Sequence, residues 1–431
     1  MSTHKQALTE HELDHFKKID HQIVKISKSI RVISALAWPA ETSQVFFRAW
    51  RKKKLQLPKI VYPKFELSEQ WQELKKIAHA CDAQHPIGVY LQQTALSYCA
   101  AARMLESVGT PAFRTLSIAL YGRPKDHLGK VTSLKLAKEF IKITDDFSEI
   151  LMMDEGLAEH CIRPEALADD FMTRSESFFG KRHAVKVEID PHLAAKAAAG
   201  GSKVRVRGAT SYSQIEIEQL WQHEVLVHSL TLINGRKQPH FKTFGIGSPR
   251  TTATQEGLAT FAELITATMD LPRLRRIALR IVAIQLALDG ADFIEVLHFF
   301  IESGQSEAES FQSTARIFRG ADLAGRNVFT KDVVYLKGLF AVHTFLRKSV
   351  ESRKVDYPSR LFLGRLALGD VISLEPFLQE PYVHKAHYLP QWVANKQGLA
   401  AYLSYALLAN RVRLKDIKIE DFEHHLDLSM V

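Results

Sequence analysis

The sequence predicts an α+β protein that is predominantly helical and carries one small β-sheet. Apolar residues recur at three- and four-residue steps along most of the 431 residues, as in amphipathic helices. Strict alternation of apolar and polar residues is confined to two short segments near the middle of the chain. The best candidate for a membrane span, residues 277–288, is interrupted by Arg280 and Gln285, so no membrane span is expected.

The first 140 residues are expected to form a helical N-terminal region. Helical spacing extends over residues 9–54, apart from a break at Pro39. Two prolines in residues 57–63 exclude a helix there and indicate an extended linker. Residues 67–120 return to the helical pattern. This region therefore contains no predicted strand.

Residues 141–431 are expected to form a second region, which contains the sheet. Alternating apolar residues predict strands at 184–189 and 203–207, separated by a turn of small residues. A helix follows immediately, and the hydroxyl of Ser211 or Ser213 can cap it. A strand thus leads directly into a helix.

Charge and cysteine content restrict the environment and the partners. A net charge of +9 suits an acidic partner or substrate, and no nucleic-acid-binding module accompanies it, so nucleic acid is not an expected partner. Three widely spaced cysteines, Cys81, Cys99 and Cys161, indicate a reducing compartment and argue against a cysteine metal site. Residues 1–10 lack the apolar core of a signal peptide, so a cytoplasmic location is expected.

The residues that point to chemistry follow the second predicted strand. His223, Glu224 and His228 lie on the helix after it, and Glu256 lies on the next helix. A catalytic zinc ion takes three protein ligands and leaves a fourth position for water. Two imidazoles and the carboxylate of Glu256 are suitable ligands, and Glu224, next to the first histidine, can act as the general base.

The spacing of the two histidines requires a distorted helix. Four residues correspond to about 40° around an α-helix, whereas the five residues between His223 and His228 correspond to about 140°. One inserted residue that is accommodated as a π-bulge restores a common face, and such bulges are frequent at functional sites. We predict a widened turn between Glu224 and His228.

The residue pattern alone leaves a structural and a zinc-binding interpretation open. Two histidines and a glutamate on an amphipathic helix are more often structural than metal-binding. The second helix favours zinc, because Glu256 lies near its start beside Gly257 and Ala259, whose small side chains let two helices approach closely. Thr260 and Glu263 lie near the same face and are candidate hydrogen-bond partners for a metal-bound histidine.

A family resemblance favours the zinc interpretation. Several short motifs carry it, namely Trp38-Pro39, His85-Pro86, Tyr121-Gly122-Arg123-Pro124, His223-Glu224-Val225-Leu226-Val227-His228, Asn234-Gly235, Gln238-Pro239, Gln255-Glu256-Gly257-Leu258-Ala259 and residues 329–338. In this combination the sequence resembles the bacterial QEGLA-motif family, named for a proposed link to flavohaemoglobin expression. That family is similar to the eukaryotic microtubule-associated tyrosine carboxypeptidases, which remove the C-terminal tyrosine of α-tubulin. The resemblance covers most of the chain.

The resemblance implies a zinc metallopeptidase that uses one Zn²⁺ ion. It implies that His223, His228 and Glu256 are the metal ligands and that Glu224 is the catalytic base. The sequence departs from the commoner family form at Leu226-Val227, where many members have Gly-Thr. The expected ligands themselves are intact.

The last motif supplies candidate substrate contacts. Thr330 can cap a helix on which Lys331 and Tyr335 lie four residues apart on one face. A phenol such as that of Tyr335 can donate to the oxyanion that forms when a peptide carbonyl is attacked, and Lys331 can bind a terminal carboxylate. Arg316 and Arg319 are alternative carboxylate ligands. The competing interpretation places Tyr335 in the core and Lys331 at a solvated helix start, and the resemblance favours the functional one.

The expected protein therefore has a zincin-like catalytic region behind a helical N-terminal region. An exposed sheet edge beside the metal can hold the substrate backbone in extended form. We expect hydrolysis of a peptide bond near the C-terminus of a peptide or protein, acidic ones included. Two alternatives are a non-catalytic zinc-binding regulatory protein that contacts an acidic partner, and metal-assisted hydrolysis of a non-peptide amide. The presence of Glu224 disfavours the regulatory protein, since a structural zinc site needs no base.

Overall fold

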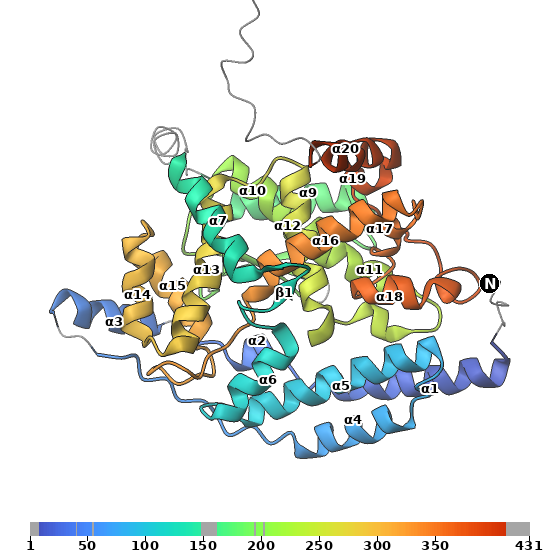
Figure 1. The fold of residues 1–431 in the computed structure, drawn as a ribbon, viewed down its shortest axis with the longest axis horizontal. Coiled ribbons are helices and arrows are strands. Elements are labelled where there is room, and N and C mark those ends of the chain that lie inside the picture. The colour runs from blue at the N-terminus through green and yellow to red at the C-terminus, as the bar shows by residue number, and fades with distance from the viewer. Residues whose placement is uncertain are drawn as a thin grey trace, which may run out of the picture.

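The N-terminal helices begin where the sequence provides caps. In the computed structural model, Thr9 and Glu12 form a capping box at the start of α1 (Glu10–Ser27), and α5 (Pro86–Glu106) begins with a proline. Helices α1 and α4 (Ser68–Ala80) pack against α5, which leads into α6 (Pro111–Tyr121) (Figure 1). The structure describes residues 8–39, 41–53, 56–147, 162–193, 195–200 and 203–410.

Short elements connect this layer to the rest of the molecule. After α2 (Val32–Ala35), helix α3 (Glu41–Arg51) lies beside α14 (Phe293–Glu302) and α15 (Glu307–Phe318) at the left edge of Figure 1. A hairpin of β1 (His127–Leu128) and β2 (Val131–Thr132) leads into α7 (Ser133–Asp146), which packs on α13 (Leu271–Asp289) and α16 (Val333–Glu351). The proposed division of the chain after residue 140 falls within α7.

The small sheet has three strands, in the spatial order β3 (Lys186–Asp190), β5 (Lys203–Arg207), β4 (Ala197–Gly200). Strands β3 and β5 are parallel and confirm the two segments predicted from alternation. Strand β4 is antiparallel to β5, with Ala199 opposite Val204, although its small residues are expected from sequence to form a turn. Within the described residues β4 pairs as a strand only with β5, and the N–H of Ala199 in β4 donates to the side chain of Glu224.

One long helical segment carries both histidines. Ser213 and Glu216 form a capping box at the start of α10 (Gln214–Leu220), so Ser213 is the cap of this helix. The segment continues without a break through η1 (Trp221–Ser229), which is a π-helix, into α11 (Leu230–Arg236). Trp221, Val225 and Val227 are buried, and they anchor the distorted part of the segment in the core.

Helices α12 (Thr252–Ile265) and α16 lie side by side at the centre of the molecule (Figure 1). Their separation is set by two glycines, because a Cβ atom on Gly257 would lie 2.3 Å from the carbonyl oxygen of Gly338. The close approach that Gly257 permits is therefore with α16. Helix η1 packs on α12 as well, which places the histidines next to Glu256.

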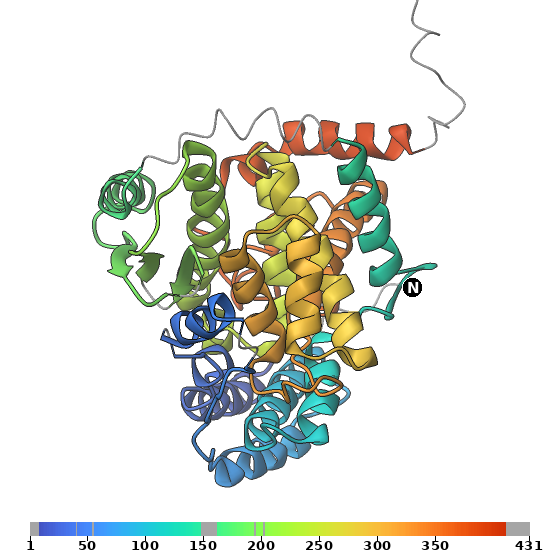
Figure 2. The ribbon, with the colours of Figure 1, turned by 90° about the vertical axis from the view of Figure 1, so that its left-hand side faces the viewer.

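The remaining helices complete a predominantly helical α+β fold, as predicted. Figure 2 shows the sheet, in green, to one side of the yellow and orange helices α13, α14 and α15. The other elements are η2 (Lys242–Gly245), η3 (Pro249–Thr251), α9 (Pro164–Phe179), α17 (Tyr357–Arg360), α18 (Leu368–Ser373), η4 (Glu375–Phe377), α19 (Gln391–Ala394) and α20 (Lys396–Ala409). In the described ranges, none of the helices combines the length and the apolar character needed to span a bilayer. Cys81 and Cys99 are buried free thiols, and Cys161 lies outside the described residues.

Candidate active site

The π-helix brings His223 and His228 onto one face. Its hydrogen bonds connect residues five apart, so two side chains separated by five residues lie one above the other. The centroids of the two rings are 4.8 Å apart and the ring planes are inclined by 86°. The predicted widened turn between Glu224 and His228 is confirmed, and it extends over all nine residues of η1.

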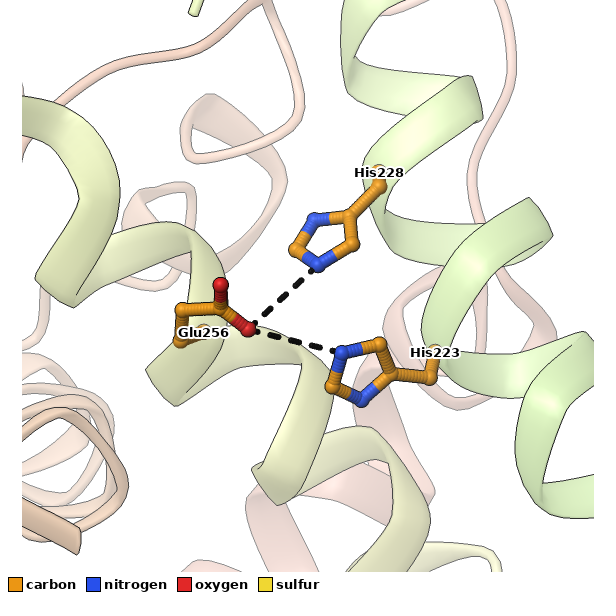
Figure 3. A group of neighbouring side chains, drawn as sticks. All are labelled: His223, His228 and Glu256. Atoms are coloured by element: carbon orange, nitrogen blue, oxygen red, sulfur yellow. Dashed lines mark ion pairs between the residues drawn. The ribbon is translucent and has the colours of Figure 1, made fainter. Parts of the chain in front are cut away.

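Glu256 completes a group of three that can hold a metal ion. Figure 3 shows its carboxylate facing the two imidazoles, which project toward it from the neighbouring helical segment. Its Oε2 atom lies 3.5 Å from Nε2 of His223 and 3.6 Å from Nε2 of His228. The three ligand atoms all lie within 4.8 Å of one another. The three predicted ligands are therefore brought together by the fold.

The oxygen of Glu256 that faces the histidines is buried and has no hydrogen-bond partner within the described residues. The other oxygen, Oε1, accepts from Nζ of Lys331 at 2.8 Å. Burial raises the pKa of Glu256, but Lys331 and the two histidines outweigh it and hold this pKa well below its usual range. A buried, ionised carboxylate oxygen between two imidazole nitrogens is the environment that a metal cation stabilises.

Glu263 orients the first histidine from about two turns further along α12 than Glu256. Its Oε1 lies 2.5 Å from Nδ1 of His223, which leaves Nε2 directed toward Glu256. Gln219 donates to Glu263 at 2.8 Å, and Arg273 forms an ion pair with it at 3.2 Å. Burial raises the pKa of Glu263, but the opposite effect of Arg273 and His223 is larger, so the pKa is lowered to about 2. The prediction that Glu263 contacts a histidine is confirmed, whereas Thr260 bonds only to carbonyls of its own helix.

Gln255 is the corresponding neighbour of the second histidine. Its Oε1 lies 3.5 Å from Nδ1 of His228 and accepts from the hydroxyl of Thr231 at 3.0 Å. Sequence reasoning identified Gln255 as part of a motif and assigned it no role. Adjacent residues Gln255 and Glu256 thus contact opposite sides of the His228 ring.

Glu224 connects the metal group to the sheet. Its side chain is buried, and its Oε2 accepts from the backbone N–H of Ala199 in β4 at 2.6 Å. Glu224 and His223 both line the same cavity, so the carboxylate lies beside the space in front of the metal group. The edge strand that sequence reasoning missed therefore contacts the proposed base directly.

The last motif lies next to Glu256, although its helix begins later than predicted. Helix α16 starts at Val333 with Asp332 as its N-cap, so the prediction that Thr330 caps it is wrong. The hydroxyl of Thr330 instead pairs with that of Ser117 at 3.0 Å. Lys331 therefore precedes the helix, and its Nζ lies 3.5 Å from the hydroxyl of Tyr335.

Arg316 is held by Asp332 in front of Tyr335. Its Nε and Nη2 donate to the two oxygens of Asp332 at 2.6 and 2.9 Å, and Nη2 lies 3.3 Å from the Tyr335 hydroxyl. The Tyr335 phenol thus lies between two cations, Lys331 and Arg316. Tyr335 also lines the cavity, which confirms that it faces an open space as well as the core.

A cavity of about 870 Å³ opens from the metal group. Basic side chains dominate its lining, on α3 (Arg48 and Arg51), near the sheet (Lys196 and Arg207) and on the helices behind it (Arg280, Arg316 and Arg319). The acidic residues of the lining are fewer, and two of them, Glu216 and Glu309, are paired with lysine or arginine. The cavity is therefore a positively charged cleft whose lining includes His223 and Glu224.

The chain is similar to known proteins over the segment that contains these residues. The model of a family described as microtubule-associated tyrosine carboxypeptidase matches residues 44–411, which include every residue of the site. A mouse protein, microtubule-associated tyrosine carboxypeptidase 1, is 28% identical over 172 residues, covering 39% of this chain and 35% of the mouse protein. The match thus spans about a third of that relative. The predicted similarity to these peptidases is confirmed, and placement in the bacterial QEGLA-motif group stays a prediction.

Proposed function

This chain belongs to the microtubule-associated tyrosine carboxypeptidase family, and we propose that it is a zinc-dependent carboxypeptidase that removes residues from peptide or protein C-termini. The observation that carries the proposal is the position of the unpartnered Glu256 oxygen, 3.5 and 3.6 Å from the two imidazole nitrogens. Ligand atoms about 2.1 Å from a tetrahedral zinc ion lie about 3.4 Å apart. The distances from the Glu256 oxygen to the two nitrogens are close to this value and support a zinc site.

The ligand set also favours a catalytic ion over a structural one. His223, His228 and Glu256 provide three ligands, which leaves the fourth position free for water or substrate. A zinc ion held there would supply a Lewis acid and lower the pKa of a bound water toward about 7. Glu224, buried beside His223, supports the same interpretation, because a purely structural site has no use for a base.

We assign the proton transfers to Glu224. Its carboxylate lies at the metal end of the cleft and is fixed by the N–H of Ala199 at 2.6 Å. In the proposed reaction Glu224 accepts a proton from the attacking water and delivers it to the nitrogen of the departing residue. The scissile C–N bond breaks as the new C–O bond is completed, and the products are a shortened peptide and a free amino acid.

Tyr335 is proposed to stabilise the oxyanion that develops on the attacked carbonyl. Its hydroxyl lies 3.3 Å from Arg316 and 3.5 Å from Lys331, so positive charge flanks the phenol. Lys331 and Arg316 each have a carboxylate partner already, Glu256 and Asp332. We therefore propose that these two contribute to substrate binding through charge and through the position of Tyr335.

The sheet and the cleft indicate how the substrate is held. We propose that an extended peptide lies along β4 next to Glu224, as in strand addition, and that it takes the backbone groups of β4 other than the Ala199 N–H, which donates to Glu224. The basic lining of the cleft favours an acidic segment before the terminal residue. The buried free thiols Cys81 and Cys99 fit the cytoplasmic location that we propose.

The test is C-terminal trimming of a peptide library by purified protein, followed by mass spectrometry. Peptides that end in tyrosine are included, because the family is named for that activity. We expect loss of C-terminal residues, abolition of this loss by a chelator, and its recovery when zinc is added. Zinc-loaded protein that leaves every peptide intact would overturn the assignment and favour a regulatory zinc protein.

A further inference from the structure

Two arginines face the cleft without a carboxylate partner of their own. Arg319, which directly follows α15, forms no hydrogen bond or ion pair with any residue that the structure describes, and its Nε is buried. Arg280 of α13 lies 3.7 Å from Asp332 at its nearest contact, and its Nε is likewise buried without a partner. Both side chains line the cavity that contains Tyr335.

The nearby carboxylates are already used. Asp332 receives both of the short hydrogen bonds from Arg316, and Glu263 pairs with Arg273 and His223. Arg280 and Arg316 therefore share Asp332, the charge of Arg319 is added nearby, and the local charge is positive. Burial, together with the charge of Arg316, lowers the pKa of Arg280 to about 9 and that of Arg319 to about 10.

An uncompensated buried guanidinium is unfavourable in the absence of an anion, because the group cannot lose its proton in the neutral range. The planar fork of arginine matches the two oxygens of a carboxylate. Arg280 is connected to the reaction centre, since contacts run from Glu256 through Lys331 and Tyr335 to Arg316 and Asp332. Arg280 contacts the same Asp332. Arg319 lines the same cavity and interacts electrostatically with Arg316 and Tyr335.

We infer that Arg280 and Arg319 together bind the α-carboxylate of the substrate's C-terminal residue. This inference rests on the proposed carboxypeptidase function and makes it specific, because it restricts the enzyme to free C-termini. Arg316 is then a positioning residue, held by Asp332 against Tyr335. Arg280 has no place in the sequence motifs, and only the packing of α13 against α15 and α16 brings it to the cleft.

The experiment measures binding, so that it does not depend on turnover. Zinc-loaded Glu224→Gln protein is incubated with two versions of one random hexapeptide library, one with a free C-terminal carboxylate and one with a C-terminal amide. We expect the free acids to be retained about tenfold more strongly. Arg280→Gln and Arg319→Gln, each made in the same background, should reduce this preference to less than about twofold.

Two further variants make the result specific. Arg319→Lys keeps the charge but not the fork, and it should recover part of the preference. Arg275→Gln is the matched control, because Arg275 lies on the same helix as Arg280 and pairs with Asp145 outside the cleft at 2.7 Å. It should retain the full preference. Circular dichroism and zinc content establish that each variant is folded.

The inference is overturned if the parent protein binds acids and amides equally, if it binds neither, or if the preference survives in both glutamine variants. The proposed function is judged separately, by trimming with the wild-type protein. If the wild type trims peptides but the parent variant shows no preference for free carboxylates, the proposed role of Arg280 and Arg319 is wrong and the proposed peptidase activity stands. If binding shows a preference for free carboxylates that depends on Arg280 and Arg319, but the wild type trims no peptide, the carboxylate-binding site is supported and the proposed peptidase activity is contradicted.

Discussion

The carboxylate of Glu263 lies 2.5 Å from Nδ1 of His223 and turns the opposite ring nitrogen, Nε2, toward Glu256. Glu263 is fully buried and is itself held by Gln219 and Arg273. A residue that binds no metal thus fixes the direction of a metal ligand. This relationship leads to the first prediction.

Glu263→Gln should weaken zinc binding about 10- to 100-fold, since the loss of an outer hydrogen bond to a ligating histidine has an effect of this size. Competition with a fluorescent chelator measures the affinity. Glu218→Gln is the control, because Glu218 of α10 pairs with Arg174 of α9 and is in no ion pair with the proposed ligands. An unchanged zinc affinity in Glu263→Gln would show that Glu263 has only a structural role.

Removal of the metal should destabilise the folded protein. A ligand present at about 1,000 times its dissociation constant contributes about 4 kcal/mol to the free energy of unfolding. We expect a chelator to lower the unfolding temperature of the wild type and to leave that of His228→Ala unchanged, because this variant lacks one ligand. Equal responses of the two proteins would contradict the ligand assignment.

Gly257→Ala should destabilise the protein by about 1–3 kcal/mol, as overpacking does in other tight contacts. The added methyl group would meet the backbone of Gly338 and push α12, which carries Glu256, away from α16. Urea unfolding measures the loss. Gly369→Ala is the control, since the space around Gly369 is open, and a similar loss there would refute the packing explanation.

Asp332 should determine part of the acid stability. Burial raises its pKa, but Arg316 and Arg280 outweigh this effect, so the folded-state pKa lies below the usual value of 3.8. Its contribution to stability is therefore complete above about pH 4 and disappears as the pH falls through the lower folded-state pKa. Loss of one partner of a buried pair costs about 3–5 kcal/mol, which is the destabilisation expected for Asp332→Asn at pH 7.

Denaturant unfolding between pH 7 and pH 3 measures this dependence. The difference between the wild type and Asp332→Asn should become smaller toward the acidic end of the range. Asp356→Asn removes an exposed pair with Lys396 and should cost less than about 1 kcal/mol at any pH. A pH-independent difference for Asp332→Asn would mean that its charge is unimportant.

Local patterns predicted the elements whose residues have a clear period. Alternation identified β3 and β5, and the five-residue interval between His223 and His228 predicted the widened turn that is part of the π-helix η1. The grouping of His223, His228 and Glu256 was predicted as well, because the family motifs favoured a zinc site that the residue pattern alone left open.

Features that depend on packing could not be predicted in this way. Strand β4 consists of alanine and glycine, and it is a strand because it pairs with β5 and because Glu224 accepts a hydrogen bond from its Ala199 N–H. Arg280 follows the periodicity of an ordinary helix, and its exposure to the cleft depends on where α13 lies. Thr330 has the chemistry of a cap, but Ser117 from a distant helix binds it instead.

The measurement that tests the central claim most directly compares C-terminal residue release by zinc-loaded wild-type protein and by Glu224→Gln. Glutamine keeps the size of the side chain and removes its ability to accept a proton, while His223, His228 and Glu256 stay in place. We expect the wild type to release C-terminal amino acids and Glu224→Gln to lose at least about 100-fold of that rate with its zinc content unchanged. Equal release by the two proteins, or none by the wild type with zinc bound, would contradict the proposed carboxypeptidase.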